Sequence, residues 1–233
     1  MSNNQANKAA QLIRSSLLGE LRLLLPNEHE EALSVVRAYR DDHKLALVTA
    51  NNGLRSCLRT LGLEGEVTQR LKRVPTIVDK LRRQPTMKLS QMHDIGGCRV
   101  VLVSADEVEK VKARFARNSR SRNGKDDKII DYVMSPRSSG YRAVHLRTFY
   151  RNRKVEVQLR TSGQHAWAVF VENLGEVSKH DLKSGEGPQS VLNWLRKLAD
   201  GIAHEEAGMV LDETFGHELA RLAKLAQKDL RRT

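Results

Sequence analysis

The chain is poor in cysteine, in aromatic residues and in long apolar runs. Cys57 and Cys98 are its two cysteines among 233 residues, and no Cys/His cluster has metal-ligand spacing. We therefore expect neither a disulfide framework nor a zinc site, and we expect a reducing, cytoplasmic location. No run approaches the ~18 apolar residues of a membrane helix, and the N-terminus lacks signal-peptide features, so we expect no membrane contact.

Acidic residues are also scarce relative to basic ones. Forty Lys and Arg residues stand against 28 Asp and Glu, which gives a formal net charge of +12. Such a surplus indicates partners that carry phosphate, and nucleotides, RNA and anionic lipid all have this property. The stretch from Lys110 to Lys128 is especially basic, and we predict that it is a mobile loop after a helix.

Helical patterns flank a central region of strand patterns. Helices are predicted over Ala9–Leu25 and Glu30–Leu61, joined at Pro26 and Asn27, over Val67–Arg83 with a kink or restart at Pro75, and over 105–118. Strands are predicted to start at Cys98, Ile129, Ala143 and Lys154, and two amphipathic helices follow "KSGEGP". This order predicts an α/β (α+β) fold with an N-terminal helical arm (1–65), a core (66–182) and C-terminal helices (183–233).

Polar residues alternate along one of these strands. In "VEVQLRTSGQHAWA", Glu156, Gln158 and Arg160 share a strand face, because successive strand residues point to opposite faces. Alternation alone also fits a half-buried edge strand. In "HDIGGCRV", Asp94 stands just before another strand, where an Asx turn is the alternative. Mg²⁺ is held by one or two carboxylates plus phosphate oxygens, so Asp94 and Glu156 are a candidate Mg²⁺ pair.

Four motifs in a fixed order carry a family resemblance. "RLKRVPTIVDKLRR", "DIGGCRV", "DYVMSPRSSGYRAVH" and "VEVQLRTSGQHAWA" closely resemble the synthetase domain of the RelA/SpoT family, which makes the alarmones pppGpp and ppGpp. The resemblance runs from about Val67 to Glu172. The flanking helices, without hydrolase, TGS or ACT regions, resemble those of a small alarmone synthetase. The resemblance implies a mixed, nucleotidyltransferase-like sheet of about five strands surrounded by helices.

The resemblance also implies a role for individual residues. Asp94 matches the catalytic Mg²⁺ ligand. Glu156 matches the second carboxylate, which aligns the metal or helps to remove the proton from the attacking hydroxyl. Tyr141 matches a tyrosine that stacks on the acceptor guanine. The positions that match ATP-binding residues are Arg70, Lys72, Lys80, Arg83 and Arg99. The acceptor-side positions are Arg137, Tyr141, His145, Gln158, Arg160, Gln164 and His165. The implied reaction transfers the β,γ-diphosphate of ATP to the 3′-hydroxyl of GDP or GTP and releases AMP.

The acceptor stays open at this point. Four positions, Thr76, Arg137, Ser139 and Ala143, depart from the commonest family residues, and three of them lie on the acceptor side. "QHAWAVFVENLGEV" followed by "LKSGEG" resembles the toxic, phage-defence branch, whose members use other acceptors, including the 3′ CCA end of tRNA. Adenosine nucleotides are a further option, because a tyrosine stacks on either purine.

Three other matters also stay open: assembly as a homo-oligomer, control by an antitoxin or phage-derived protein, and the role of the terminal helices. The competing hypothesis from another class is a non-enzymatic RNA-binding module on the same fold. That hypothesis predicts the loss of Asp94 or Glu156, and both are present.

Overall fold

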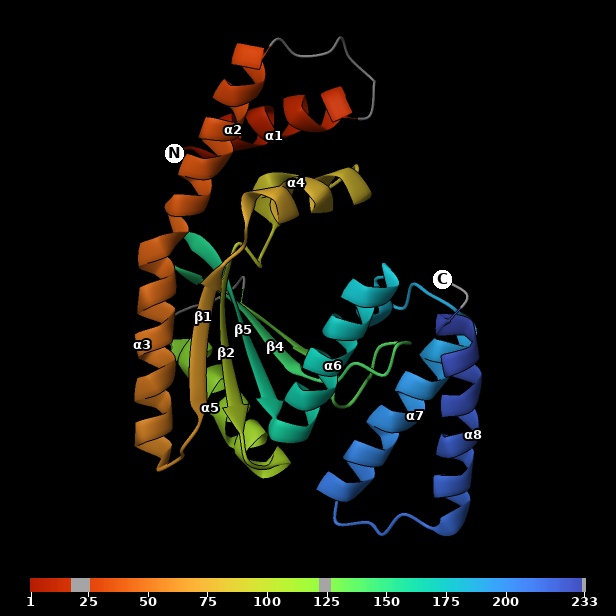
Figure 1. Cartoon of the computed structure of the whole chain (residues 1–233). Helices are drawn as coiled ribbons and strands as arrows, with labels where there is room; N and C mark the ends of the chain where they lie inside the picture. Colours follow the sequence, from red (N-terminus) through yellow and green to blue (C-terminus); the bar gives the residue numbers. More distant parts are fainter. Residues whose placement is uncertain (18–25, 122–126, 232–233) are drawn as a thin grey trace.

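A five-stranded mixed sheet forms the centre of the molecule in the computed structural model, which describes residues 1–17, 26–121 and 127–231 (Figure 1). The strand order is β1-β2-β5-β4-β3; β2 and β5 run parallel, and the other neighbouring pairs are antiparallel. The strands are β1 (Glu66–Leu71), β2 (Gly96–Leu102), β3 (Lys128–Asp131), β4 (Val144–Tyr150) and β5 (Arg153–Thr161). The implied mixed sheet of about five strands is confirmed.

Helices surround this sheet. They are α1 (Asn3–Leu17), α2 (Pro26–Asp41), α3 (His43–Leu61), α4 (Val74–Arg83), α5 (Ala105–Ser121), α6 (Ser162–Ser178), α7 (Gln189–Glu206) and α8 (Glu213–Leu230), with two 3₁₀ turns, η1 (Leu89–Gln91) and η2 (Leu182–Ser184). None of the helices in the described ranges is long and apolar enough to cross a membrane.

The main apolar core lies on one face of the sheet. Val100 of β2 and Val157 and Leu159 of β5 pack in one cluster with Leu54 of α3 and Val111 of α5. Burying these side chains leaves the alternate residues of the same strands on the opposite face. Separate clusters join α1, α2 and α4, and join α6 with α7 and α8. The proposed division at 65/66 and 182/183 stays a prediction.

The predicted helix over Val67–Arg83 is wrong in its first part, which is strand β1. Val67 is the one fully buried residue of this six-residue edge strand, so the sequence offered too little apolar alternation to reveal it. Pairing with β2 decides the conformation. Pro75 lies in the first turn of α4, where its missing N–H costs no helical hydrogen bond.

Two further predictions need correction. The helix over Glu30–Leu61 is divided at Asp42, whose carboxylate pairs with the N-terminal amino group and with Arg153. The basic loop over 110–128 is helical as far as Ser121, because Val108 and Val111 bury their side chains in the main core. Residues 122–126, and residues 18–25 of the first predicted helix, lie outside the described part of the chain.

A tight hairpin joins β4 to β5. Tyr150 pairs with Arg153, and the two intervening residues, Arg151 and Asn152, have φ angles of 48° and 60°. Positive φ at both central residues matches the right-handed twist of the two strands. The turn thereby fixes the register that sets Glu156 opposite Arg147 and Gln158 opposite His145.

The loop before β4 packs tightly on α7 at Gly140. This residue has φ +90°, and a Cβ here would lie 2.9 Å from Arg196 Cα and 3.1 Å from Ala199 Cβ. We expect Gly140→Ala to lower the free energy of unfolding by roughly 2 to 4 kcal/mol, from backbone strain and overpacking together. Urea denaturation measures the change. Gly216→Ala in α8 is the matched control, because its Cβ would meet no atom within 4 Å, and it should be neutral or stabilising.

Candidate active site

Polar side chains from four strands share the sheet face opposite the main core. The register sets Glu156 of β5 beside Gly97 of β2, and Gly97 in turn pairs with Arg70 of β1. Gln158 lies between Arg99 of β2 and His145 of β4. Because paired residues of neighbouring strands point to the same face, these groups form one polar surface.

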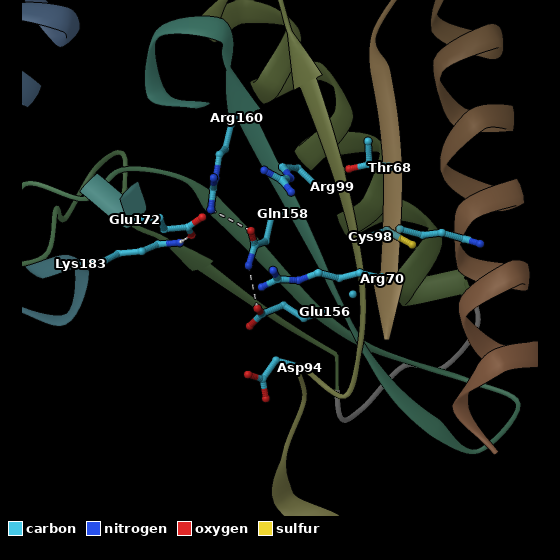
Figure 2. Close-up of a pocket in the computed structure, with 12 residues that line it drawn as sticks. Thr68, Arg70, Asp94, Cys98, Arg99, Glu156, Gln158, Arg160, Glu172 and Lys183 are labelled. Carbon is cyan, nitrogen blue, oxygen red and sulfur yellow. Dashed lines mark hydrogen bonds and ion pairs between the residues drawn. The ribbon is translucent and has the colours of Figure 1, made fainter. Parts of the chain in front are cut away.

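A cavity opens over this surface (Figure 2). It is lined by Thr68, Gln69, Arg70, Asp94, Gly97, Cys98, Arg99, Glu156, Gln158, Arg160, Glu172 and Lys183. The lining therefore contains both predicted carboxylates together with three of the predicted arginines. Four cations and three carboxylates in one cavity suit a polyphosphate ligand that brings its own metal ion.

Asp94 lies at one end of the cavity and is held by two lysines. Lys80 Nζ of α4 lies 2.9 Å from Oδ1, and Lys72 Nζ, just after β1, lies 3.1 Å from Oδ2. Burial would raise the pKa of Asp94, but the charges of Lys80 and Lys72 outweigh it and hold the pKa below its ordinary value. The carboxylate is therefore ionised at neutral pH.

Glu156 is held through both of its oxygens and is 7% exposed. His145 Nδ1 lies 3.2 Å from Oε1, Arg147 Nε lies 3.6 Å from the same oxygen, and Gln158 Nε2 donates to Oε2 at 3.1 Å. Burial would raise the pKa of Glu156, but His145, Gln158 and Arg147 together lower it to about 2. Glu156 is thus a fixed negative charge.

These two carboxylates fit the requirements of Mg²⁺. Both are ionised and line the same cavity, and Mg²⁺ is usually bound by one or two carboxylates with substrate phosphates and water. Within the described residues, no three His, Cys, Asp or Glu side chains lie together in a way that could hold a metal ion by themselves. A bound Mg²⁺ would therefore take its remaining ligands from the substrate and from water.

The arginines make the cavity strongly electropositive. Burial and the neighbouring charges of Arg160 and Arg70 lower the pKa of Arg99, whose Nη1 lies 3.1 Å from His165 Nδ1. Arg160 is 2% exposed, and its buried Nε has no hydrogen-bond partner among the described residues. Buried donors are normally satisfied, so this N–H is a candidate to donate to a bound ligand or a water molecule.

Several predicted site residues lie away from the cavity. Gln164 forms a capping box with Thr161 at the start of α6, where its side chain accepts from the Thr161 N–H. Arg83 pairs with Asp79 and Asp181, and Arg137 donates to the Tyr132 hydroxyl; neither lines the cavity. Gln164 is therefore a helix-capping residue in this structure.

Tyr141 does not present an open face to a base. Its side chain is 1% exposed, and the Tyr132 ring meets it edge-on. The Lys183 ammonium lies 5.1 Å from the ring centroid and the Arg137 guanidinium 5.5 Å. The stacking of an acceptor base on this ring stays a prediction, and it requires the side chains that cover the ring to move aside.

Two charged residues of the cavity, Glu172 and Lys183, were not predicted from the sequence. They form an ion pair between α6 and η2, visible at the edge of the cavity in Figure 2. Glu172 follows His165 by seven residues, so helical spacing could have placed both on one face of α6. Lys183 stands in a polar, glycine-rich turn, and we see no signal that marks it.

The sequence is similar to those of several known proteins. A profile described as the region found in RelA / SpoT proteins matches residues 69–174. The GTP pyrophosphokinase YjbM of Bacillus subtilis is 33% identical over 161 residues, which cover 63% of this chain and 68% of that protein. An uncharacterised protein of Mycobacterium tuberculosis is 34% identical over 125 residues, or 54% of this chain. The match spans only 45% of the mycobacterial protein.

The fold is also similar to solved structures. The crystal structure of the small alarmone synthetase 1 from Bacillus subtilis bound to its product pppGpp aligns with a TM-score of 0.58 and 22% identity, over 74% of this chain and 93% of that one. The crystal structure of smu.1046c from Streptococcus mutans aligns with a TM-score of 0.56 and 25% identity, over 78% and 99%.

Proposed function

Because this chain belongs to the RelA/SpoT family, we propose that it is an ATP-dependent pyrophosphokinase that transfers the β,γ-diphosphate of ATP to the 3′-hydroxyl of GDP or GTP. The observation that carries the proposal is the shared cavity of Asp94, Glu156 and the three arginines of β1, β2 and β5. A nucleotide triphosphate needs both the positive charge and the metal-binding carboxylates found there.

In the proposed reaction, the acceptor 3′-oxygen forms a bond to the β-phosphorus of ATP. The bond between that phosphorus and the α,β-bridging oxygen breaks, AMP leaves with the bonding electron pair, and the hydroxyl proton passes to solvent or a basic group. Positioning and neutralisation of charge should supply most of the rate enhancement. Arg70 and Arg99 would hold the adenine, and Lys72 and Lys80 the phosphates.

The two carboxylates would hold Mg²⁺, which would neutralise charge that develops on the phosphate oxygens when it is bound. A carboxylate with a pKa of about 2 is a weak proton acceptor at neutral pH. This favours an electrostatic and orienting role for Glu156 over the role of principal general base.

The test is a transfer assay with purified protein, Mg²⁺ and γ-labelled ATP. GDP, GTP, ATP and bulk tRNA are offered as acceptors in separate reactions. We expect label in a guanosine tetra- or pentaphosphate, and AMP in equal amount. If no acceptor receives the label, the proposal is contradicted. Label in tRNA or in an adenosine product would show that this molecule, and not GDP or GTP, is the acceptor.

The net charge of +12 favours tRNA as a second candidate acceptor, because tRNA offers many more phosphates than GDP. Transfer to tRNA should then weaken steeply as salt is raised. Transfer to GDP should depend on salt much less, because fewer counterions are released. A salt titration with both acceptors therefore separates the two substrates.

A further inference from the structure

One row of paired residues crosses the whole sheet on the face that carries the cavity. From β3 to β1, the row consists of Lys128, Arg147, Glu156, Gly97 and Arg70. Gly97 has no side chain, so it leaves open space between Arg70 and Glu156. The cavity covers the row from Arg70 to Glu156, whereas Arg147 and Lys128 extend the row beyond the cavity to the edge of the sheet.

The contacts of β3 show which way Lys128 points. Asp131, at the other end of this strand, pairs with Lys112 of α5, and α5 packs against the main core. Residues an odd number of positions apart in a strand point to opposite faces. Lys128 is three positions from Asp131 and therefore points to the cavity face, where it is exposed.

Both cations have donors available for a ligand. Arg147 Nε lies 3.6 Å from Glu156 Oε1, which is too long for a hydrogen bond, and the guanidinium makes no hydrogen bond to another described residue. The Arg147 side chain is 33% exposed. No hydrogen bond or ion pair joins Lys128 to a residue within the described ranges. Phosphate oxygens are strong acceptors for such cationic donors.

The two cations lie on the side of Glu156 from which the acceptor should approach. In phosphoryl transfer, the attacking and leaving oxygens are roughly in line, with the phosphorus between them. The proposed adenine-binding residues Arg70 and Arg99 belong to β1 and β2, so AMP should leave over these strands. The acceptor then approaches over β4 and β3, which carry Arg147 and Lys128.

The spacing of the strands suits a chain of phosphates. Neighbouring strands lie about 4.8 Å apart, so the backbones at Arg147 and Lys128 are about 5 Å and about 10 Å across the sheet from Glu156. A nucleotide whose 3′-hydroxyl reaches a metal ion at Glu156 carries its 5′-phosphates on the far side of the ribose. The inner phosphates would then lie nearer to Arg147, and the outer ones nearer to Lys128.

We propose that Arg147 and Lys128 bind the 5′-phosphates of the acceptor, and that they select nucleoside di- and triphosphates over unphosphorylated nucleosides. Arg147 contacts the inner phosphates, and Lys128 contacts the outermost one. The inference rests on the proposed function for the side from which the acceptor approaches. Binding of the acceptor is nevertheless measurable without any transfer.

The test is isothermal titration with guanosine, GDP and GTP, in the presence of Mg²⁺ and without ATP. The parent should bind GDP and GTP more tightly than guanosine. Arg147→Gln should weaken binding of GDP by about 10-fold or more relative to guanosine, because it removes a charged hydrogen-bond donor. Lys128→Gln should weaken binding of GTP by about threefold, and of GDP less, because its charge is exposed.

Lys110→Gln is the matched control, because Lys110 is an exposed cation on α5, which packs against the opposite face of the sheet. It should change none of the three affinities. Equal loss of guanosine and GDP binding in Arg147→Gln would overturn the inference, because Arg147 would then act only through Glu156. So would equal binding of guanosine and GDP by the parent, or unchanged binding of GTP by Lys128→Gln.

Transfer assays add a second readout. The KM of GDP should rise in Arg147→Gln while the KM of ATP stays unchanged, and a rise confined to ATP would place Arg147 at the donor phosphates and overturn the inference. If the parent transfers diphosphate to no acceptor, the proposed function fails. The three affinities still decide whether Arg147 and Lys128 bind 5′-phosphates.

Discussion

Replacement of Glu156 with glutamine should lower the rate of diphosphate transfer by about 1,000-fold or more, equivalent to roughly 4 kcal/mol of transition-state stabilisation. The substitution removes a fixed negative charge from the cavity. It also replaces one oxygen with an NH₂ group, whereas His145 Nδ1 and Gln158 Nε2 lie 3.2 Å and 3.1 Å from the two oxygens of Glu156. A glutamine amide has a single oxygen, so at least one of these two contacts is lost as well.

The measurement is kcat with saturating Mg²⁺ and both substrates, alongside thermal unfolding of each variant. Glu176→Gln is the matched control, because it is the same change at an exposed position on α6. If folded Glu156→Gln transfers diphosphate at the parental rate, Glu156 is not a ligand of the metal ion. A large loss in Glu176→Gln would point to a general effect of charge.

Replacement of Asp94 with asparagine should cause a comparable loss of rate, but a different change in binding. Asp94 is the shared counter-ion of Lys72 and Lys80 in the ligand-free protein. Its neutralisation removes a metal ligand and, at the same time, releases both ammonium groups for phosphate. We therefore expect Asp94→Asn to transfer diphosphate about 1,000-fold more slowly, yet to bind ATP several-fold more tightly when Mg²⁺ is absent.

Isothermal titration with ATP in the presence of EDTA measures the second effect. Asp41→Asn at the end of α2 is the control, because Asp41 pairs with Arg40 and Lys44 at an exposed surface and not with Lys72 or Lys80. Exposed ion pairs contribute little, so this control should change the rate and the affinity by less than about threefold. Weaker metal-free binding of ATP by Asp94→Asn would show that Lys72 and Lys80 do not contact the phosphates.

The strands that build the site could be predicted because their alternation is strong. Val155, Val157 and Leu159 enter the core, and the residues between them form the cavity floor, as the pattern in the sequence indicates. Strand β1 could not be predicted, because an edge strand with one buried residue carries almost no periodic signal. Its conformation comes from pairing with β2, which is a tertiary interaction.

The partners of Glu156 were harder to predict than Glu156 itself. Gln158 is the next residue on the same face of β5, so alternation alone places it beside Glu156. His145 reaches Glu156 only because the hairpin register sets it opposite Gln158, and the sequence alone does not give that register. The surroundings of Tyr141 could not be predicted for a similar reason. A tyrosine after a glycine-rich loop fits stacking or packing equally, and its burial and its 2.7 Å contact with His145 follow from the tertiary structure.

The two-residue turn between β4 and β5 has a consequence for the order in which the protein folds. The hairpin joins residues 144–150 to 153–161, whereas the β2–β5 pair must bring residue 96 to residue 155. Closing a short loop costs less chain entropy, so local pairings form early and distant pairings form late. We therefore expect His145, Glu156, Gln158 and Arg160 to assemble first as one local unit. Asp94 and Arg99 would join when β2 pairs with β5. The acceptor-side residues of β4 and β5 would thus be in place before the ATP-side residues of β2.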